Sequence, residues 1–439
     1  MLESGEKVVA TINLLWPAPS KGPTMRPGSL SLIPCSLPLS ATLTPGMPHV
    51  LAQSVELLTS ALAVAGMGYF LAAMIAARVF LAARRAPLPA FAPGVSVLKS
   101  LKGLDPGMID AFRSHCRQNY AGEYELLFGV SSLADPAVPA VEQLKQEFPE
   151  RAILLVECPE KLGTNGKVST LTQLAVHARH DYLLINDSDI TVSPRYLERV
   201  MALFAPPTVN AQPQVGLVTA LYRGKAHGTL PSRLEALGIA TDFQSGVLLS
   251  KMIEGGLSYG LGSTLAVSRE ALRKIGGLLP LADHLADDYE LGARVARAGC
   301  RVALSPEVVE TGVPAYAWKG FLDHQVRWAR TVRDARPGGY IGLIFTHGLS
   351  WAILNVLASG LSPLSMWLLG MSFFLRLTLA MMVGAEVLGD HQVLPGLWLL
   401  PLRDLVAMGV WVAGFAGNTI VWRGERFALR DGKLLKTAK

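Results

Sequence analysis

The strongest constraint on this chain is an uncharged run of 21 residues, Leu57 to Ala77, which lies between Glu56 and Arg78. At about 1.5 Å per helical residue, such a run is about as long as the 30 Å hydrocarbon core of a bilayer. Core helices of soluble proteins are rarely apolar over such a length. The run therefore predicts a transmembrane helix, which we place in an N-terminal anchor at residues 51–85.

Basic residues flank this run on one side only. No Lys or Arg occurs from Pro27 to Ala77, whereas Arg78, Arg84 and Arg85 follow directly. Cytoplasmic flanks of membrane helices carry the excess of Lys and Arg. We therefore expect an integral protein of the inner (cytoplasmic) membrane, in contact with the lipid bilayer, whose main domain is cytoplasmic.

The composition supports a chain that is partly embedded in lipid. Half of the 439 residues are apolar and only 17% are charged, while the net charge of +6 suits contact with anionic lipids and ligands. No dense Lys/Arg run with interleaved aromatic residues occurs, so no nucleic acid is expected as a partner. The four cysteines are far apart and predict neither a zinc site nor a disulfide framework.

The two ends of the chain have different characters. Residues 1–50 are rich in Pro, Ser and Leu and are predicted to form a disordered extension. No charged residue occurs between Arg336 and Arg376, and we place three to four C-terminal membrane segments at 338–422. The basic tail at 423–439 is expected in the cytoplasm, which three full crossings would not allow, so one apolar segment is expected in the membrane interface.

Between residues 90 and 335, short apolar strand patterns alternate with helical patterns. Tyr124–Val130 and Tyr182–Ile185 are predicted strands, and Val138–Glu147 is a predicted helix. This alternation indicates an α/β domain with a mostly parallel sheet, which binds ligands beyond the carboxyl ends of its strands. The segment 230–261 has two interpretations, an amphipathic element at the membrane surface or a core helix on the sheet.

Three short motifs stand out for their chemistry and their order. A DxD motif at a strand end can hold a divalent metal against a nucleotide diphosphate, a later carboxylate can deprotonate a hydroxyl, and an Arg can neutralise a leaving diphosphate. Each motif alone has a simpler interpretation, as a solvated loop, a helix cap or a membrane-edge anchor. Their combination predicts sugar transfer at a membrane. The motifs are Asp187-Ser188-Asp189, Asp287-Asp288 and Arg327-Trp328.

Together with further motifs, these residues resemble the membrane-bound family-2-like glycosyltransferases. Within that family the resemblance is strongest to the ceramide glucosyltransferase branch and the related bacterial hopanoid-biosynthesis glycosyltransferases. It implies a GT-A-type (Rossmann-like) domain flanked by transmembrane helices. The motifs that carry the resemblance, besides the three above, are Leu101-Lys102-Gly103-Leu104-Asp105-Pro106, Ala134-Asp135-Pro136-Ala137 and Gly163-Thr164-Asn165-Gly166-Lys167-Val168.

The resemblance also implies a role for each motif residue on the donor side. Asp135 matches a residue that holds the nucleotide, and Lys167 would place a positive charge near the diphosphate or sugar. Asp189 is expected to contact Mg²⁺ or Mn²⁺ directly, and Asp187 to contact the ribose or sugar and to share in the metal site. Asp287 is counted with the substrate-binding residues.

On the acceptor side, Asp288 matches the general base that deprotonates the acceptor hydroxyl. Arg327 would neutralise the departing diphosphate, and Trp328 would pack against the acceptor or the site wall. His324 stands where the family pattern has Gln or Arg, with Gln325 one place later, and its imidazole would donate to a diphosphate oxygen.

The resemblance therefore implies an inverting transfer of a hexose or N-acetylhexosamine from UDP-glucose or UDP-GlcNAc to a hydroxyl of a membrane lipid. Both a ceramide-like lipid and a hopanoid polyol fit as the acceptor, and the Ser132-Leu133-Ala134-Asp135 form and His324 favour the hopanoid. His324 also counts against one alternative, a processive polysaccharide synthase. The other alternative is a membrane transporter or scaffold with a nucleotide-binding domain. Its candidate intramembrane charges are Arg376, Arg403 and Asp404, although near span ends these side chains could snorkel.

Overall fold

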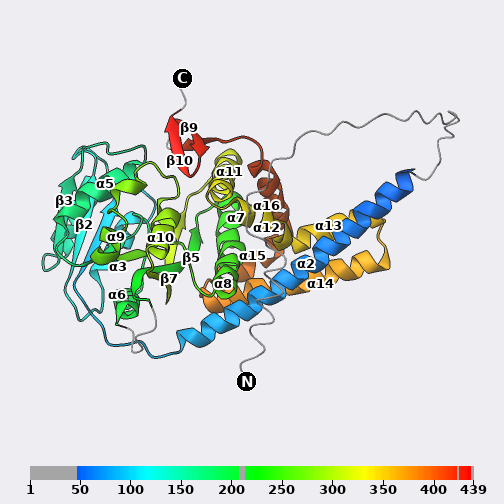
Figure 1. Cartoon of the computed structure of the whole chain (residues 1–439), viewed down its shortest axis with the longest axis horizontal. Helices are drawn as coiled ribbons and strands as arrows, with labels where there is room; N and C mark the ends of the chain where they lie inside the picture. Colours follow the sequence, from blue (N-terminus) through cyan, green and yellow to red (C-terminus); the bar gives the residue numbers. More distant parts are fainter. Residues whose placement is uncertain (1–46, 207–212, 423–424, 437–439) are drawn as a thin grey trace, which may run out of the picture. The chain divides into compact units, whose positions relative to one another are not determined.

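A seven-stranded sheet forms the centre of the computed structural model, which describes residues 47–206, 213–422 and 425–436 (Figure 1). Its strand order is β3-β2-β1-β4-β6-β5-β7. Only β6 runs antiparallel to its neighbours β4 and β5, and the other pairs are parallel. The structure thus confirms the predicted α/β class. The strands are β1 Val95–Ser100, β2 Tyr124–Val130, β3 Ala152–Glu157, β4 Tyr182–Ile185, β5 Val215–Ala226, β6 Leu265–Ser268 and β7 Arg301–Val313.

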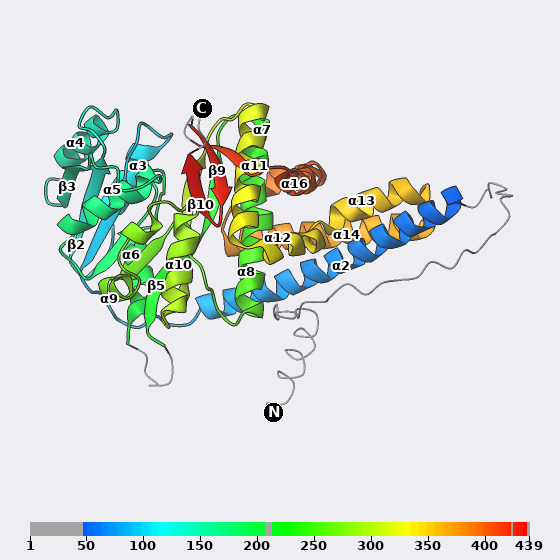
Figure 2. The ribbon, with the colours of Figure 1, turned by 45° about the horizontal axis from the view of Figure 1, so that its top comes forward.

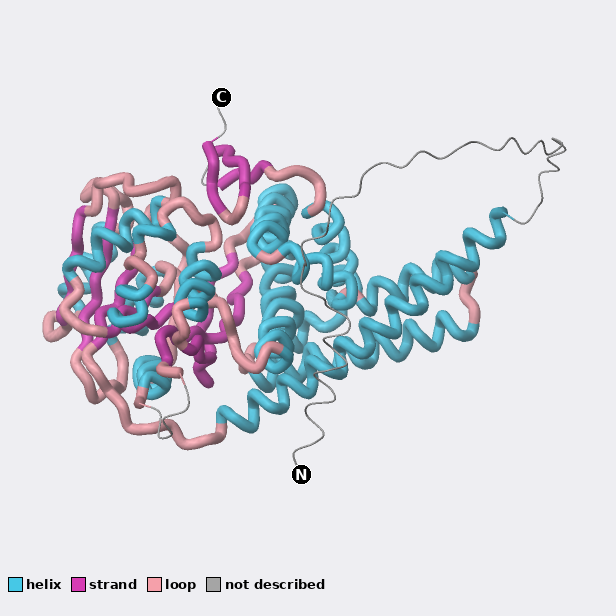
Figure 3. The backbone as a smooth tube through the Cα atoms, viewed as in Figure 1, coloured by secondary structure: helices cyan, strands magenta, loops and turns pink. Residues whose placement is uncertain are grey.

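Helices connect the strands and cover the sheet (Figure 3). The side chains of Asn165 and Ser268 cap the helices that follow them, by accepting hydrogen bonds from the backbone N–H groups of Val168 and Ala271. The helices are α3 Met108–Cys116, α4 Val138–Glu147, α5 Gly166–Leu174, α6 Tyr196–Met201, α7 Leu230–Gly238, α8 Gln244–Ile253, α9 Arg269–Lys274, α10 Asp287–Arg297 and α11 Trp318–Ala335.

The segment with two interpretations forms α7, a π turn at Ile239–Phe243 (η3) and α8. Helix α7 packs on β5, and its neighbours also include α11 and the apolar helix α16, Leu400–Gly414. The structure therefore agrees with a core helix on the sheet, and the segment also separates the sheet from the apolar C-terminal helices (Figure 2).

Among the described residues, three helices are long and apolar enough to cross a membrane, and a helix pair bent by 57° could form a fourth. The three are Val50–Arg84, Pro363–Val387 and Val393–Gly414, and the bent pair is Pro337–Thr346 with Gly348–Ser359. The elements in these regions are α2 Met47–Arg84, α12 Pro337–Gly342, α13 Gly348–Ser359, α14 Pro363–Ala380 with the π turn η6 Met381–Val387, α15 Val393–Gly396 and α16. Residues 1–46 of the predicted N-terminal extension lie outside the described residues, and 47–50 belong to the first turn of α2.

Helices α2, α13 and α14 lie side by side in both ribbon views (Figures 1 and 2). A Cβ atom at Gly66 of α2 would collide with the backbone of Gly348 in α13, so the two glycines allow close helix packing. The Asn355 side chain of α13 donates hydrogen bonds to the Glu56 carbonyl and to the Thr59 hydroxyl of α2, at 3.0 and 2.9 Å. Small residues and polar contacts thus join the N-terminal helix to the C-terminal helices.

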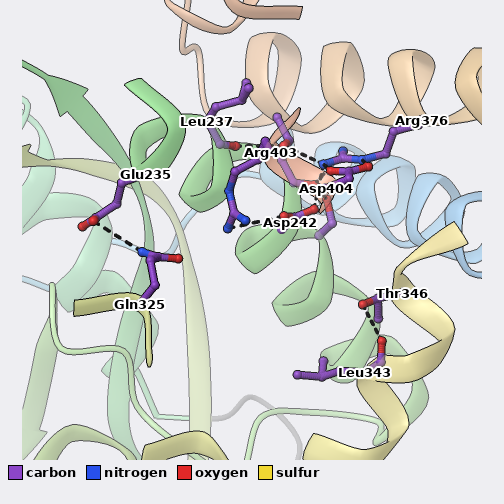
Figure 4. A network of polar contacts seen from close by, with 11 residues as sticks. Glu235, Leu237, Asp242, Gln325, Leu343, Thr346, Arg376, Arg403 and Asp404 are labelled. Carbon is purple, nitrogen blue, oxygen red and sulfur yellow. Dashed lines mark hydrogen bonds and ion pairs between the residues drawn. The ribbon is translucent and has the colours of Figure 1, made fainter. Parts of the chain in front are cut away.

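Charged side chains near the predicted span ends do not snorkel but are buried and paired (Figure 4). Arg376 of α14, 1% exposed, donates to both carboxylate oxygens of Asp404 in α16, each at 2.9 Å. It also donates to Asp242 in the π turn η3, at 2.7 Å, while Arg403 lies 3.6 Å from Asp242. The sequence did not reveal this pairing because its members are far apart along the chain.

The end of the chain differs from the prediction of apolar helix through 422. Helix α16 ends at Gly414, and the chain then turns at Gly417, whose φ of +75° favours glycine. The described residues after it include a three-stranded antiparallel sheet, which we call the C-terminal sheet, and Thr419, Ile420 and Val421 of its first strand are of the β-branched type that favours strands. Its strands are β8 Thr419–Trp422, β9 Glu425–Arg430 and β10 Lys433–Lys436.

Candidate active site

The DxD motif leaves the sheet at the carboxyl end of β4, beside the end of β1. Leu98 of β1 pairs with Ile185 of β4, so Lys99 lies next to the start of the motif. The Lys99 side chain is 1% exposed, and its ammonium group donates to the Asp187 carbonyl oxygen at 2.9 Å. Burial lowers the pKa of Lys99 to about 7, against the opposing effect of the Asp189 and Asp187 carboxylates. Lys99 thus anchors the backbone of the motif.

Lys167 joins the DxD motif to the second acidic motif. Its ammonium nitrogen lies 2.6 Å from Asp187 Oδ1 and 3.5 Å from Asp287 Oδ2. Burial lowers the pKa of Lys167, but the Asp187 and Asp287 charges outweigh burial and the net pKa is raised, so Lys167 remains charged. Asn165, the helix cap just before it, also donates to Asp287 Oδ1 at 3.2 Å. The Gly-rich turn thereby brings three of the predicted residues together.

Asp189 faces β7, which was not predicted from the sequence. Its Oδ2 atom accepts hydrogen bonds from the Thr311 hydroxyl at 2.5 Å and the Gly312 backbone N–H at 2.9 Å. Burial, and then the Asp187 charge, raise the pKa of Asp189. Within the described ranges, no three His, Cys, Asp or Glu side chains form a group that could hold a metal ion by themselves.

Asp288 lies in the first turn of α10, directly after Asp287. Its Oδ1 accepts from the Tyr289 backbone N–H at 2.8 Å. A Cβ atom at Gly262 would lie 2.9 Å from Asp288 Oδ2, so the glycine leaves the space that the carboxylate occupies. Burial, followed by the Asp287 charge, raises the pKa of Asp288 to about 6. A carboxyl with this pKa is suited to exchange a proton near neutral pH.

Asp135 and His324 each contact other parts of the protein. Asp135 Oδ1 accepts from the backbone N–H groups of Gly103 and Ala137, both at 2.9 Å, so it ties together the loops after β1 and β2. His324 Nδ1 lies 3.2 Å from Oε2 of the buried Glu235 in α7. Gln325 donates to the same oxygen at 3.3 Å (Figure 4).

Aromatic rings surround the motif on α11. The His324 ring stacks on Tyr316 with centroids 5.6 Å apart and contacts Trp328 at 5.1 Å. Trp328 in turn contacts Phe243 at 6.2 Å, at the end of the π turn η3. Trp328 and Arg327 are both partly buried. This cluster ties α11 to the segment that also contacts the apolar helices.

Four residues of this site were not predicted: Lys99, Asn165, Glu235 and Thr311. Lys99 carried the clearest signal, since a lysine at the end of an apolar strand must find a buried partner. Asn165 lay inside a recognised motif but had no role of its own. Nothing in the local sequence of Glu235 or Thr311 indicates which distant residue they contact.

Comparisons with known proteins agree on the class of protein. The model of glycosyl transferase family 21 matches residues 58–435. Ceramide glucosyltransferase 3 of Caenorhabditis elegans is 25% identical over 354 residues, which cover 77% of this chain and 73% of the relative. Ceramide glucosyltransferase of Candida albicans is 30% identical over 116 residues, which cover 24% of this chain and 21% of the relative.

A solved structure has a similar fold. The mannosyltransferase PcManGT from Pyrobaculum calidifontis, in complex with GDP-Man and Mn²⁺, aligns with a TM-score of 0.50 and 21% sequence identity. The alignment covers 82% of this chain and 99% of that structure. This likeness supports the GT-A-type fold of the sheet domain. Because the family model matches most of the chain, the protein belongs to glycosyl transferase family 21 and is a glycosyltransferase that acts on a lipid.

Proposed function

We propose that this protein transfers glucose or N-acetylglucosamine from a UDP-sugar to a hydroxyl group of a membrane lipid, with inversion at the anomeric carbon. The observation that carries the proposal is that Lys167 contacts both Asp187 and Asp287. Asp287 directly precedes Asp288 in the chain. These contacts join the part of the fold expected to hold a nucleotide diphosphate to a carboxylate suited to act as a base.

In the proposed reaction, the Asp288 carboxylate takes the proton of the acceptor hydroxyl. The oxygen then bonds to the anomeric carbon from the side opposite UDP, and the bond between that carbon and the diphosphate oxygen breaks with its electron pair leaving on UDP. Arg327 lies on α11 and offers a permanent positive charge for the departing diphosphate. The aromatic cluster around Trp328 would form the wall for the acceptor.

The donor set of the DxD motif fits Mg²⁺ or Mn²⁺. Asp187 and Asp189 supply hard carboxylate oxygens, and such ions take their remaining ligands from diphosphate oxygens and water. A bound ion would neutralise charge on the diphosphate as it leaves. The similar mannosyltransferase from Pyrobaculum calidifontis is described with Mn²⁺ and a nucleotide sugar, which supports this assignment.

We further propose that the catalytic domain and the C-terminal sheet lie on the cytoplasmic face of the inner membrane. The sheet pairs with the loop before α10, so the two share one side of the bilayer. The chain between them then crosses the membrane an even number of times. Since α13 and α14 lie along α2 in Figure 1, whereas α16 packs on α11 and α7 of the catalytic domain as well as on α13, α16 is the apolar segment that we place in the interface.

The test is a transfer assay on purified protein in detergent with Mg²⁺ or Mn²⁺, in which radiolabelled UDP-glucose and UDP-GlcNAc are each offered with ceramide and with a hopanoid polyol. A single glycolipid from one pair, with the inverted anomeric configuration by NMR, supports the proposal and identifies donor and acceptor. A ladder of polymer lengths would instead support a processive synthase. Absence of both product and UDP release would favour the transporter or scaffold alternative.

A further inference from the structure

The C-terminal sheet continues, through backbone hydrogen bonds, into the loop that precedes the two acidic residues of α10. The Leu434 N–H donates to the Asp283 carbonyl at 2.8 Å, and the Leu285 N–H donates to the Gly432 carbonyl at 3.0 Å. Residues 283–285 thus pair with the free edge of β10 through an isolated antiparallel bridge between His284 and Lys433. We call residues 283–285 the docking loop.

A small apolar cluster supports these bonds. Leu285 is the only member from the docking loop, and the other four come from the C-terminal sheet. All five are at most 8% exposed, and they form a cluster distinct from the main core of the domain. The docking loop therefore depends on the end of the chain to bury its leucine. The members are Leu285, Ile420, Phe427, Leu429 and Leu434.

The opposite side of the docking loop holds the Gly-rich turn. Asp283 Oδ1 accepts from the Thr164 N–H at 2.9 Å, and the His284 carbonyl accepts from the Asn165 side chain at 2.8 Å. The same Asn165 amide donates to Asp287 Oδ1. A continuous chain of hydrogen bonds thus runs from β10 through the docking loop to Asp287 and, through Lys167, to the DxD motif.

The C-terminal sheet also holds α11, which carries Arg327 and Trp328. About one turn after these residues, Arg330 donates to the Thr419 carbonyl of β8 and to the Ala416 carbonyl just before that strand, and Arg333 donates to the Gly414 carbonyl at the end of α16. The Asp334 carboxylate accepts from the Gly432 backbone N–H. Figures 1 and 2 show β9 and β10, in red, beside α11 and near α10.

We propose that the C-terminal sheet is a positioning element of the active site. It holds Asp288 and the Arg327-Trp328 motif of α11 in place relative to the donor-binding residues. This inference rests on the proposed function. The docking loop and α11 approach the site from different parts of the chain, and the C-terminal sheet contacts both. If the sheet is loosened, the docking loop and the first turn of α10 lose their support, and Asp288 loses its alignment with the acceptor. Lys99, Asp135 and Asp189 contact other elements, and Lys167 keeps its 2.6 Å contact with Asp187, so these donor-side residues stay in place. We therefore expect a loss of kcat with little change in donor binding.

Two adjacent leucines of β10 provide a matched test. Leu434 is 2% exposed in the apolar cluster, whereas Leu435, on the opposite face of the strand, is 46% exposed. Leu434→Ala should lower kcat by about tenfold or more while the Kd for UDP stays within about twofold, and Leu434→Met should restore most of the activity. Leu435→Ala should leave both quantities within about twofold of the wild type. Equal effects of the two alanine variants, or a parallel loss of UDP binding and kcat, would overturn the proposal.

A second pair of variants covers the case in which Leu434→Ala does not fold. Asp334→Ala removes the acceptor for the Gly432 N–H and should also lower kcat, whereas Asp323→Ala, which removes an exposed ion pair with Lys319 on the same helix, should not. An unchanged kcat in Asp334→Ala would count against positioning.

Hydrogen exchange provides a readout that does not require activity. In Leu434→Ala, the Leu285 amide should exchange faster than in the wild type, while amides of β1 and β4 should not change. If the wild type makes no glycolipid, the proposed function fails, but the exchange experiment still tests whether the C-terminal sheet orders the docking loop. Unchanged exchange at Leu285 would refute that ordering.

Discussion

Replacement of Asp288 by Asn tests the base of the proposed mechanism most directly. The amide has nearly the same shape as the carboxylate but cannot accept the hydroxyl proton. General-base catalysis contributes about 10²–10⁴-fold to enzymatic rates, so kcat should fall by that factor. The Kd for UDP in the presence of Mn²⁺ should change little, because Lys99, Lys167 and the DxD motif are retained.

The pKa of Asp288 predicts the pH dependence of the wild-type enzyme. With a pKa of about 6, the carboxylate is about 90% ionised at pH 7 and about 10% ionised at pH 5. Since only the ionised form acts as a base, kcat/KM should rise about tenfold per pH unit below pH 6 and level off above pH 7. The residual activity of Asp288→Asn should lack this acid limb.

The same pKa allows catalysis to be separated from stability. The pKa of Asp288 is higher in the folded protein, so the folded protein binds the carboxyl proton more tightly than the unfolded chain does. The free energy of unfolding therefore falls as pH rises from 3.8 to about 6, and the total loss above that range is at most about 3 kcal/mol. An uncharged Asn avoids this cost, so the thermal stability of Asp288→Asn at pH 7.5 should equal or exceed that of the wild type. Its control is Asp110→Asn, at an exposed ion pair on α3, which should retain activity. An inactive Asp288→Asn that also unfolds earlier or loses UDP binding would refute the assignment as base.

Three further changes test other parts of the structure. Lys99→Met removes the donor to the Asp187 carbonyl and should weaken metal-dependent UDP binding about three- to tenfold, as measured by calorimetry with and without Mn²⁺. Asp189→Ala should weaken UDP-sugar binding when Mn²⁺ is present and leave metal-free binding unchanged, and an unaltered metal dependence would remove this residue from the metal site. Arg376→Met leaves Asp404 buried without its partner and should destabilise the protein by about 3–5 kcal/mol in thermal unfolding, and the additional change Asp404→Leu should recover part of that loss.

Local sequence was sufficient where short apolar runs form buried strands. Tyr124–Val130 and Tyr182–Ile185 are strands with the predicted bounds, because both runs are mainly apolar and are followed by polar residues. β7 was not predicted, since Pro306 and Glu307 interrupt its pattern and are accommodated by a register shift against β5.

The prediction of the site had a similar limit. Lys167, Asp187 and Asp287 could be identified from their motifs, and the structure brings them together. The partners that hold them, such as Thr311 for Asp189, could not be identified, because each contact depends on which strands become neighbours in the folded sheet. The C-terminal sheet was missed because the uncharged run from Leu405 to Trp422 does not show that the helix ends at Gly414, and its contact with residues 283–285 was missed because they lie about 150 residues earlier in the chain.

The pairing of β10 with residues 283–285 also orders the events of biosynthesis. Leu285 leaves the ribosome 149 residues before Leu434, which at about 5–20 residues per second corresponds to a delay of about 7–30 s. During that time the C-terminal apolar helices are made, the anchor having been made earlier, while the docking loop lacks its partner strand. The active site therefore reaches its final form only after the membrane segments have been synthesised, and a nascent chain that stops before Thr419 cannot acquire it.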